Sequence, residues 1–237
     1  LEVELGFGLG RVEALPFVPR SHGSMDVAPD GSRIVVVVND AGADKSLEVL
    51  DLAKGTRQVV GDDRRVSAPI WHIDGNSVTY SIRADSMQTM VSHPLDTVDL
   101  PQPLFDGQGA VSPWQWSLDG STLLYGEGPP KQMALMVWNR ETGEKTQIVD
   151  ASSGSLWAAQ FSPDERHIAY TQVGDAGSEV YVVPYPATGQ RWLVSGGQGE
   201  EPVWRLDTNE LVFRRGKGWY SVVYDNEAGF KFAAPER

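Results

Sequence analysis

Apolar and polar positions along the chain follow one pattern that is written five times. In each copy a mostly large apolar residue stands three positions before an aspartate, and apolar residues return four and six positions after it. The copy around Asp119 shows this plainly, with Trp116 before the aspartate and Leu123 and Tyr125 after it. An apolar period of two is typical of a β-strand with one buried face. Each copy therefore predicts two strands, one before and one after a turn.

The aspartate marks the turn and sets the period of the repeat. Most copies carry Pro-Asp-Gly, Ile-Asp-Gly or Leu-Asp-Gly between the two apolar sets, and Asp and Gly tolerate the φ values of tight reversals. The aspartates are separated by 44, 45, 45 and 43 residues and are Asp30, Asp74, Asp119, Asp164 and Asp207. A period in this range is typical of a repeat architecture. We interpret these aspartates as turn formers and not as calcium ligands, since the DxDxDG spacing is absent.

Each hairpin is followed by a polar loop and a third strand. The predicted third strands are Ser46 to Leu52, Thr89 to His93, Ala134 to Asn139, Glu179 to Pro184 and Trp219 to Tyr224. A second turn then leads to a short fourth strand, as in Thr56 to Val60, Lys145 to Val149 and Arg191 to Ser195. Four antiparallel strands in about 44 residues form one propeller blade. We therefore expect an all-β fold, a β-propeller of four-stranded antiparallel blades.

The expected organisation is a single β-propeller domain over residues 1–237. Five full blades are predicted at 21–65, 66–110, 111–155, 156–198 and 199–237, after an N-terminal half-blade at 1–20. The alternating stretches Leu1 to Leu5 and Arg11 to Phe17 predict the third and fourth strands of that half-blade. Because an unpaired strand edge is a template for another chain, we expect either a homodimer through the incomplete blade or a distorted ring in which the gap narrows. The first residue is Leu and not Met, and we expect the chain to be a segment of a longer protein.

Composition excludes several classes of function. The formal net charge of −12 argues against nucleic-acid binding and against binding to anionic membranes, because phosphate contact needs a basic field. The chain has no cysteine, which excludes disulfides, thiol catalysis and cysteine-based zinc sites. No run reaches the ~18 to 20 apolar residues of a membrane span. No metal site and no cofactor is expected from the four histidines, which are His22, His72, His93 and His167.

Motifs that carry catalysis are missing from the sequence. There is no GxSxG elbow and no HExxH pair, and nothing places a serine with a histidine and an aspartate. Gly6-Phe7-Gly8-Leu9-Gly10 has no predicted helix after it, so it does not indicate a phosphate loop. We expect His72 and His167, beside hairpin turns, to be solvated polar residues. The chain is expected not to be an enzyme.

Three stretches carry a resemblance to a known family. Trp116-Ser117-Leu118-Asp119-Gly120 and Phe161-Ser162-Pro163-Asp164 resemble the WD40-like repeat of TolB-type propellers. The stretch from Gly177 to Trp204 is similar to propellers attached to bacterial serine/threonine kinases. Glu165 and Thr208 depart from the pattern because they replace the turn glycine. The resemblance implies six blades, a role as an interaction platform, and a periplasmic or extracellular location.

Propeller geometry predicts where a partner binds. The loops that enter each first strand and the turns that join second to third strands gather at one face. Candidate binding residues there are Arg64, Arg65, Trp114, Trp157, Glu200 and Glu201. The aromatic pair could instead fill space between blades, and the charged residues could be solvated rim charges.

Two classes of function stay open on these grounds. The first is a non-enzymatic interaction or sensor module that binds a protein, a peptide or a small ligand on the loop-rich face. The second is the propeller domain of an enzyme, either the gating domain of a prolyl-oligopeptidase-like protease or a hydrolase or lyase with its site in the channel. We favour the first class, because a protease gate needs a catalytic domain that these residues do not contain.

Overall fold

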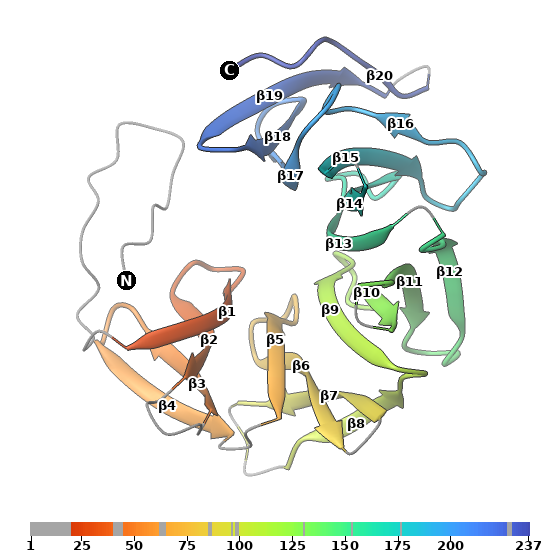
Figure 1. The fold of residues 1–237 in the computed structure, drawn as a ribbon. Helices are drawn as coiled ribbons and strands as arrows, with labels where there is room; N and C mark the ends of the chain where they lie inside the picture. The colour runs from red at the N-terminus through yellow and green to blue at the C-terminus, as the bar shows by residue number, and fades with distance from the viewer. Residues whose placement is uncertain are drawn as a thin grey trace. The chain divides into compact units, whose positions relative to one another are not determined.

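The structure, a computed structural model, describes residues 20–39, 45–61, 65–84, 87–95, 97, 100–129, 131–152, 154–175, 177–226 and 229–237. Its elements are all β-strands, arranged in five four-stranded antiparallel sheets (Figure 1). Each sheet is called a blade and is numbered in chain order. The chain divides into two compact units, Leu1–Asp106 and Gly107–Arg237, called unit 1 and unit 2.

Unit 1 holds two blades whose strands are neighbours in chain order. Blade 1 consists of β1 (Ser21–Val27), β2 (Arg33–Asn39), β3 (Lys45–Asp51) and β4 (Thr56–Gly61). Blade 2 consists of β5 (Val66–Trp71), β6 (Ser77–Ala84), β7 (Met87–Pro94) and β8 (Gln102–Asp106).

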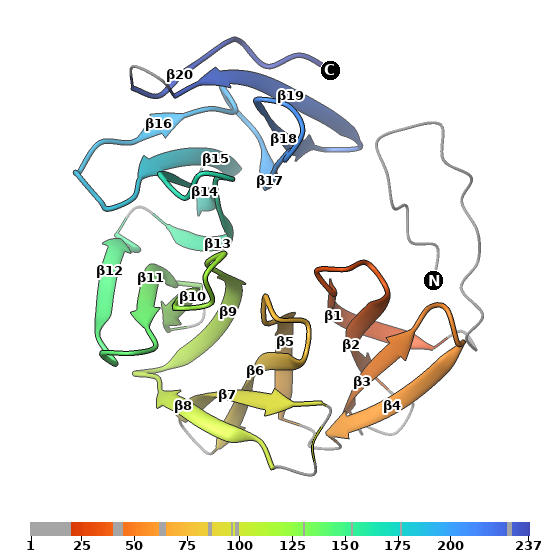
Figure 2. The same ribbon diagram turned by 180° about the vertical axis from the view of Figure 1, so that it is seen from behind.

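Unit 2 holds three blades with the same strand order. Blade 3 consists of β9 (Ala110–Trp116), β10 (Thr122–Gly128), β11 (Ala134–Asn139) and β12 (Lys145–Val149). Blade 4 consists of β13 (Ser155–Phe161), β14 (His167–Gly174), β15 (Gly177–Pro184) and β16 (Trp192–Leu193). Blade 5 consists of β17 (Glu200–Trp204), β18 (Glu210–Arg215), β19 (Gly218–Asp225) and β20 (Lys231–Phe232). Within unit 2, β9, β13 and β17 lie on one side and the fourth strands on the other, in both views (Figures 1 and 2).

The predicted all-β fold of four-stranded propeller blades is confirmed by these sheets. The predicted half-blade and its dimer seam fall almost entirely on residues 1–19, outside the described residues. The single domain and its blade boundaries stay a prediction. In the part of the chain that the structure describes, no helix is long and apolar enough to span a membrane.

The predicted role of the repeat aspartates in turn formation is confirmed in four copies. In these copies a side-chain oxygen of the aspartate accepts the backbone N–H of the residue two positions later in the chain. The pairs are Asp30 with Ser32, Asp74 with Asn76, Asp119 with Ser121 and Asp164 with Arg166. In blade 3 the hydroxyls of Ser117 and Ser121 also donate to Asp119, at 2.6 and 2.8 Å. These bonds favour the carboxylate and lower the pKa of Asp119 to about 2. The side chain of Asp207 instead pairs with Arg205, at 2.9 Å.

A residue other than glycine fills the turn of blade 4. Glu165 has φ of 55°, close to the 69° of Gly120 at the same place in blade 3. Few residues other than Gly, Asn and Asp adopt this left-handed conformation. The carboxylate of Glu165 accepts the N–H of Leu118 from the tip of blade 3, at 2.6 Å. The substitution therefore adds a bond between blades at the position where glycine would add none.

The second strand of each blade is buried on both faces. The predicted apolar positions are confirmed, since Leu123, Tyr125, Ile168 and Tyr170 are each 0 % exposed. The residue between them, such as Ala169, is equally buried and contacts the next blade. Blade 4 lies between blades 3 and 5 in unit 2, so its second strand has no solvent side.

Apolar clusters join neighbouring blades inside each unit. In unit 1, Val35, Val37 and Val49 of blade 1 pack with Trp71 and Tyr80 of blade 2. In unit 2, one cluster joins blades 3 and 4 and includes Leu124, Val137, Phe161 and Tyr170. A second cluster joins blades 4 and 5 and includes Val180, Val182, Trp204 and Phe213. The expected burial of Trp71, Phe161 and Trp204 between blades is confirmed, and Trp116 is 4 % exposed.

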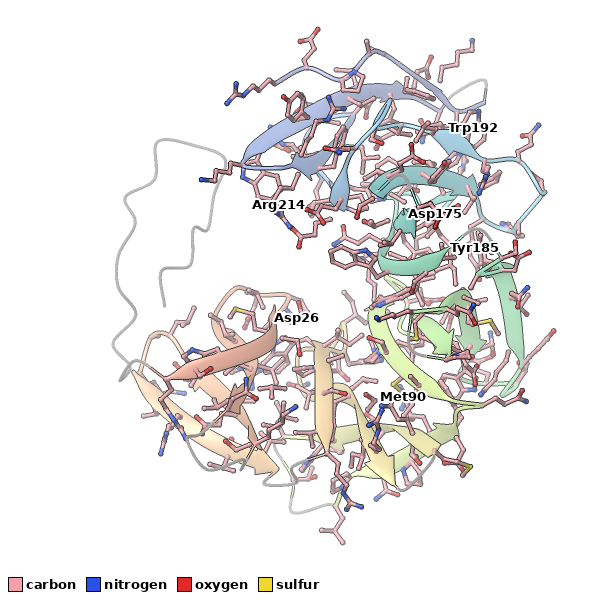
Figure 3. All side chains as sticks on the ribbon, viewed as in Figure 1. Asp26, Met90, Asp175, Tyr185, Trp192 and Arg214 are labelled. Atoms are coloured by element: carbon pink, nitrogen blue, oxygen red, sulfur yellow. The ribbon has the colours of Figure 1, made fainter. Side chains whose placement is uncertain are left out.

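Polar bonds repeat at the same junctions between first strands. Asp26 accepts the N–H of Trp71 at 2.7 Å, and it points from β1 toward blade 2 (Figure 3). The amide of Gln115 accepts the N–H of Phe161 at 2.7 Å in the equivalent place. Burial raises the pKa of Asp26. The backbone N–H groups of Trp71 and Val27, which donate to its carboxylate, lower that pKa by a smaller amount. At the junctions of blades 1 and 2 and of blades 3 and 4, a side chain of one first strand thus accepts a backbone N–H of the next first strand.

A β-bulge interrupts the first strand of all five blades. The registers of β1, β5, β9, β13 and β17 shift by one residue against their second strands. Ala68, Ala158 and Glu201 occupy the bulges of β5, β13 and β17 with φ between 50° and 57°. Bulges re-aim neighbouring side chains and increase local twist. The bulge in β17 determines the direction of Glu201.

The expectation that His72 and His167 are solvated is wrong. They are 7 % and 8 % exposed, because the turns fold back against the blades. The His167 ring lies 4.9 Å from the ring of Phe230 and 6.0 Å from that of Trp192. Its Nδ1 makes no hydrogen bond within the described part of the chain. Burial lowers the pKa of His167, against a smaller opposing effect of Asp164.

Acidification is therefore expected to destabilise the protein through His167. Because its pKa is lower in the folded state than in the unfolded state, stability is complete above about pH 6.5 and falls below it, by up to about 1.4 kcal/mol per pH unit. Burial lowers the pKa of His93 in the same direction. Urea unfolding followed by circular dichroism at pH 5, 6 and 7 measures the slope. His167→Gln should lose less stability than the wild type between pH 7 and pH 5.

The pH dependence of stability must be compared between His167→Gln and the wild type, because protonation of Asp26 changes the stability in the opposite direction. Its raised pKa means that the folded state binds a proton more readily, so this group adds stability as the pH falls. Asp26 is present in both proteins and cancels from the difference. Equal slopes for the wild type and His167→Gln would contradict the assignment.

Candidate functional site

A recess opens at one end of unit 2 between blades 3 and 4. This end, called the loop end, carries the loops that enter first strands and the turns that join second to third strands. The recess has a volume of about 770 Å³, and the residues that line it are Lys131, Ser152, Gly154, Ser155, Val173, Gly174 and Asp175. They belong to the β10–β11 turn, the loop entering β13 and the β14–β15 turn. The two predicted sets of loops therefore meet here.

The wall of this recess depends on one glycine. Gly154 has φ of 131°, and a Cβ there would collide with the carbonyl oxygen of Val173. The loop before it is shaped by Asp150, whose carboxylate accepts the N–H of Ser152 at 2.8 Å. This bond and the Ser152 side chain lower the pKa of Asp150. The loop that enters β13 is thereby held against the β14–β15 turn.

A smaller recess of about 190 Å³ lies between blades 4 and 5. The residues that line it are Ser178, Gln198, Gly199, Glu200, Arg214, Arg215 and Gly216. They come from the loop entering β17, the start of β15 and the β18–β19 turn. The larger recess is lined by the same kinds of segment, one blade earlier in the chain. Adjacent blade junctions in unit 2 thus present recesses of related construction.

Arg214 joins two of the predicted site residues. Its Nε donates to Glu201 at 2.7 Å and its Nη2 lies 2.9 Å from Glu200. The hydrogen bond that Arg214 donates to Glu201, together with the negative charges of Glu201 and Glu200, raises the pKa of Arg214. Two carboxylates share one guanidinium, so the cluster carries one net negative charge. The side chains of Arg214 and Glu201 are 35 % and 40 % exposed, and a partner could reach them.

Arg215 has a structural role at the same place. Its Nε donates to the carbonyl of Gln198 at 2.7 Å, its Nη2 donates to the carbonyl of Ser195, and its guanidinium lies 4.5 Å from the ring of Tyr220. These contacts hold the loop that enters β17 against the β18–β19 turn. The small recess therefore has fixed walls.

The other predicted site residues have different surroundings. Trp157 is a cross-strand partner of Thr171, and the Thr171 hydroxyl accepts the N–H of Glu201 at 3.0 Å. Trp157 and the Glu201 cluster therefore lie next to each other. Trp114 packs on Gly126 and Met133 and belongs to the cluster between blades 3 and 4, so the space-filling interpretation holds for it.

The predicted arginine pair belongs to unit 1. Arg65 is exposed directly before β5, and its carbonyl accepts the N–H of Arg83 at 3.1 Å. Arg64 lies outside the described residues. The binding roles of all six predicted residues stay a prediction.

Sequence reasoning missed Lys131, Thr171, Asp175 and Arg214 as individual residues. Three of them stand in loops that were predicted to form the binding face, which was the available indication. Thr171 and the pairing of Arg214 with both glutamates depend on strand register, which the sequence pattern does not contain.

Chemically, the loop end offers ion pairs, hydroxyls and backbone groups. Among the described residues no group of three or more His, Asp or Glu side chains is placed to hold a metal ion. Lys131 and Asp175 put opposite charges on the wall of the larger recess. Such a surface can bind polar and charged groups of a partner.

Comparisons with known proteins address the fold. No family model matches the sequence, and no curated protein matches it. TolB from Acinetobacter baumannii is similar in structure, with a TM-score of 0.70 at 15% identity over 92% of this chain and 55% of that one. A protein assigned as TolB from Agrobacterium tumefaciens has a TM-score of 0.71 at 15% identity, over 95% of this chain and 84% of that one.

An enzyme is also among the similar structures. An oligogalacturonate lyase in complex with manganese has a TM-score of 0.60 at 15% identity, over 95% of this chain and 67% of that chain. The chain thus spans about half of the Acinetobacter protein and larger shares of the other two. At these identities the likeness concerns the fold alone. The fold of this chain is a TolB-like β-propeller.

Proposed function

We propose that the protein is a non-enzymatic interaction module that binds a protein or peptide partner at the loop end of unit 2. The observation that supports this most is the pair of recesses at adjacent blade junctions, which share the same kinds of wall. A partner that follows the loop end would find two consecutive cavities. Binding sites are preferentially concave, with a few placed polar groups.

The charges of the recesses favour a polar partner. Lys131 and Asp175 line the larger recess, and the Glu200–Arg214 pair lines the smaller one. An extended peptide presents alternating donors and acceptors that such walls can bind. Because the similar structures include TolB proteins and a lyase, fold likeness supports neither class over the other. The proposal therefore depends on the recesses.

We further propose that catalysis is not a property of these residues and that the module works on the periplasmic or extracellular side. The first point is supported by the absence of nucleophile and metal-binding motifs from the sequence. The second point is supported by the resemblance to TolB-type repeats alone.

A peptide selection tests the proposed function. Random peptides displayed on phage are selected against the immobilised protein, and the affinities of selected peptides are measured by fluorescence anisotropy. Asp175→Lys and Lys131→Glu should each weaken binding by about tenfold or more, which corresponds to about 1.4 kcal/mol.

The matched control changes the same charge elsewhere. Glu141→Lys alters net charge as Asp175→Lys does, but Glu141 is an exposed residue in the β11–β12 turn, at the other end of blade 3. It should leave the affinity within about twofold, less than 0.5 kcal/mol. Failure to select any peptide, or peptides equally insensitive to all three variants, would contradict the proposal.

A further inference from the structure

The two faces of blade 5 differ in what covers them. One face carries Trp204, Leu211, Phe213 and Val222, which pack against blade 4. Successive strand residues point to opposite faces, so the residues between them form the second face. This face is called the far face. Arg214 belongs to it and lies on the side of blade 5 away from blade 4 (Figure 3).

The far face consists of three cross-strand rows over β17, β18 and β19. Strand register places Glu200 beside Arg214 and Arg214 beside Trp219. It places Val203 beside Val212 and Val212 beside Ser221 in the second row. The third row pairs Glu210 with Val223, and Arg205 joins it through a 3.2 Å ion pair to Glu210. Directly opposed residues share one face of a sheet.

Blade 4 shows what the equivalent rows look like when a blade covers them. Its first row contains Thr171 and Val180 and its second row contains Ala169 and Val182, which are all 0 % exposed beneath blade 5. On the far face of blade 5 the apolar residues Val203, Trp219 and Val223 are 41 %, 44 % and 57 % exposed. Trp219 stands where blade 4 has the buried Val180, whereas Val212, which stands where blade 4 has Ala169, is 4 % exposed. The exposed apolar residues of the far face therefore lie around a buried centre.

Carboxylates outnumber arginines on and around the far face, so its net charge is negative. Arg214 is shared by Glu200 and Glu201, and Arg205 is shared by Asp207 and Glu210. Four carboxylates thus surround two guanidinium groups. Arg214 also stands at the position where blade 4 has Thr171, whose hydroxyl bonds to the following blade. The far face is more polar at that row and more acidic than the buried junctions.

We propose that the far face of blade 5 is a docking surface for a partner protein that presents a small apolar patch bordered by lysine or arginine. The apolar side chains at Val203, Trp219 and Val223 supply the contact area, and the excess carboxylates select a basic border. A second copy of this chain is a poorer occupant, because a two-fold contact would oppose two acidic faces. The far face shares Glu200 and Arg214 with the smaller recess, but its apolar residues Val203, Trp219 and Val223 line neither recess, so the inference goes beyond the proposed function.

The first experiment asks whether the far face is accessible in the whole chain. Because the protein contains no cysteine, single cysteines report one site each. Val223→Cys should react with a maleimide about as fast as Leu206→Cys, whose position is 86 % exposed. Val182→Cys, at a position buried between blades 4 and 5, should react much more slowly. Reaction of Val223→Cys at the slow rate would overturn the proposal, since the chain itself would cover the face.

The second experiment measures recognition with two designed β-hairpin peptides. Both carry valines on one face, and their borders carry lysines in one peptide and glutamates in the other. Fluorescence anisotropy should show saturable binding of the lysine peptide alone. Trp219→Ser with Val223→Ser, and separately Asp207→Asn with Glu210→Gln, should each weaken it by about tenfold or more, and none of these residues lines a recess.

A control separates this surface from the general acidity of the protein. Glu141→Gln with Glu144→Gln removes the same charge from an exposed turn of blade 3 and should leave the affinity unchanged. An equal loss with this control, or equal binding of the glutamate peptide, would overturn the proposal. Light scattering adds one further outcome. A dimer that Val223→Arg abolishes would mean that a second copy is the occupant, contrary to the proposal.

Discussion

Replacing Trp204 by alanine is expected to lower the free energy of unfolding by about 3 to 5 kcal/mol. The side chain is 6 % exposed and stands between blades 4 and 5. Its ring lies edge-on to Tyr224 with centroids 4.9 Å apart, and its Nε1 donates to the carbonyl of Gln160 at 3.2 Å. The substitution leaves a cavity and removes the hydrogen bond to the carbonyl of Gln160. Chemical denaturation followed by far-ultraviolet circular dichroism measures the loss.

Two further variants show whether burial is the cause. Leu206→Ala changes a side chain that is 86 % exposed two residues later, and it should shift stability by no more than about 0.5 kcal/mol. Trp204→Phe keeps an aromatic ring but removes the N–H donor, so its effect should fall between the two. Similar losses for Trp204→Ala and Leu206→Ala would mean that the junction between blades 4 and 5 is not packed as described.

Gly154→Ala is expected to destabilise the protein by about 2 to 5 kcal/mol and to deform the larger recess. Its φ of 131° is nearly exclusive to glycine, and the added Cβ meets the carbonyl of Val173, a backbone atom that cannot move alone. Strained backbone and overpacking each cost on the order of 1 to 3 kcal/mol. Thermal and chemical denaturation measure the stability, and peptide affinity reports the shape of the recess.

Gly197→Ala is the matched control for the collision. Gly197 has φ of 134° in the equivalent loop before β17, but a Cβ there would meet nothing within 4 Å. It shares the backbone strain of Gly154→Ala without the steric clash. Its loss of stability should therefore be smaller, by about 1 to 3 kcal/mol. Equal losses for the two variants would show that the close approach to Val173 has no energetic role.

The repeat pattern was sufficient to predict the blades. Aspartate turns and the apolar positions around them placed hairpins that the structure confirms, and β11 and β12 were predicted with their observed bounds. The burial of residues such as Ala169 was not predicted. A period of two indicates one buried face, but a blade between two neighbours buries both faces of its central strand.

Bulges explain much of what the sequence did not reveal about the site. Ala68, Ala158 and Glu201 adopt the left-handed conformation without being glycine, so no local residue preference marks them. Because of the bulge in β17, the side chains of Glu200 and Glu201 leave the strand in different directions. Both nevertheless form an ion pair with Arg214 of β18. A pattern read along one strand cannot show this contact, because it depends on the register with the next strand.

The candidate site was predictable as a set of loops and not as a set of contacts. Loop-end geometry follows from blade topology, so the loops around Ser152, Val173 and Arg214 were identified from the repeat alone. The packing of Trp114 at the junction could not be read from the sequence, because it depends on its neighbour Gly126, which leaves room for the ring. Small residues that accept a neighbouring ring are visible only once cross-strand partners are known.

Hydrogen exchange in the presence of a selected peptide tests the central claim, binding at the loop end, most directly. Exchange is followed by mass spectrometry on the wild type with and without the peptide. The account predicts slower exchange at Gly154, Ser155 and Gly174, which line the larger recess, and no change at the hairpin tips that contain Leu118 and Leu206. Slower exchange confined to those tips, with none at the recess, would contradict it.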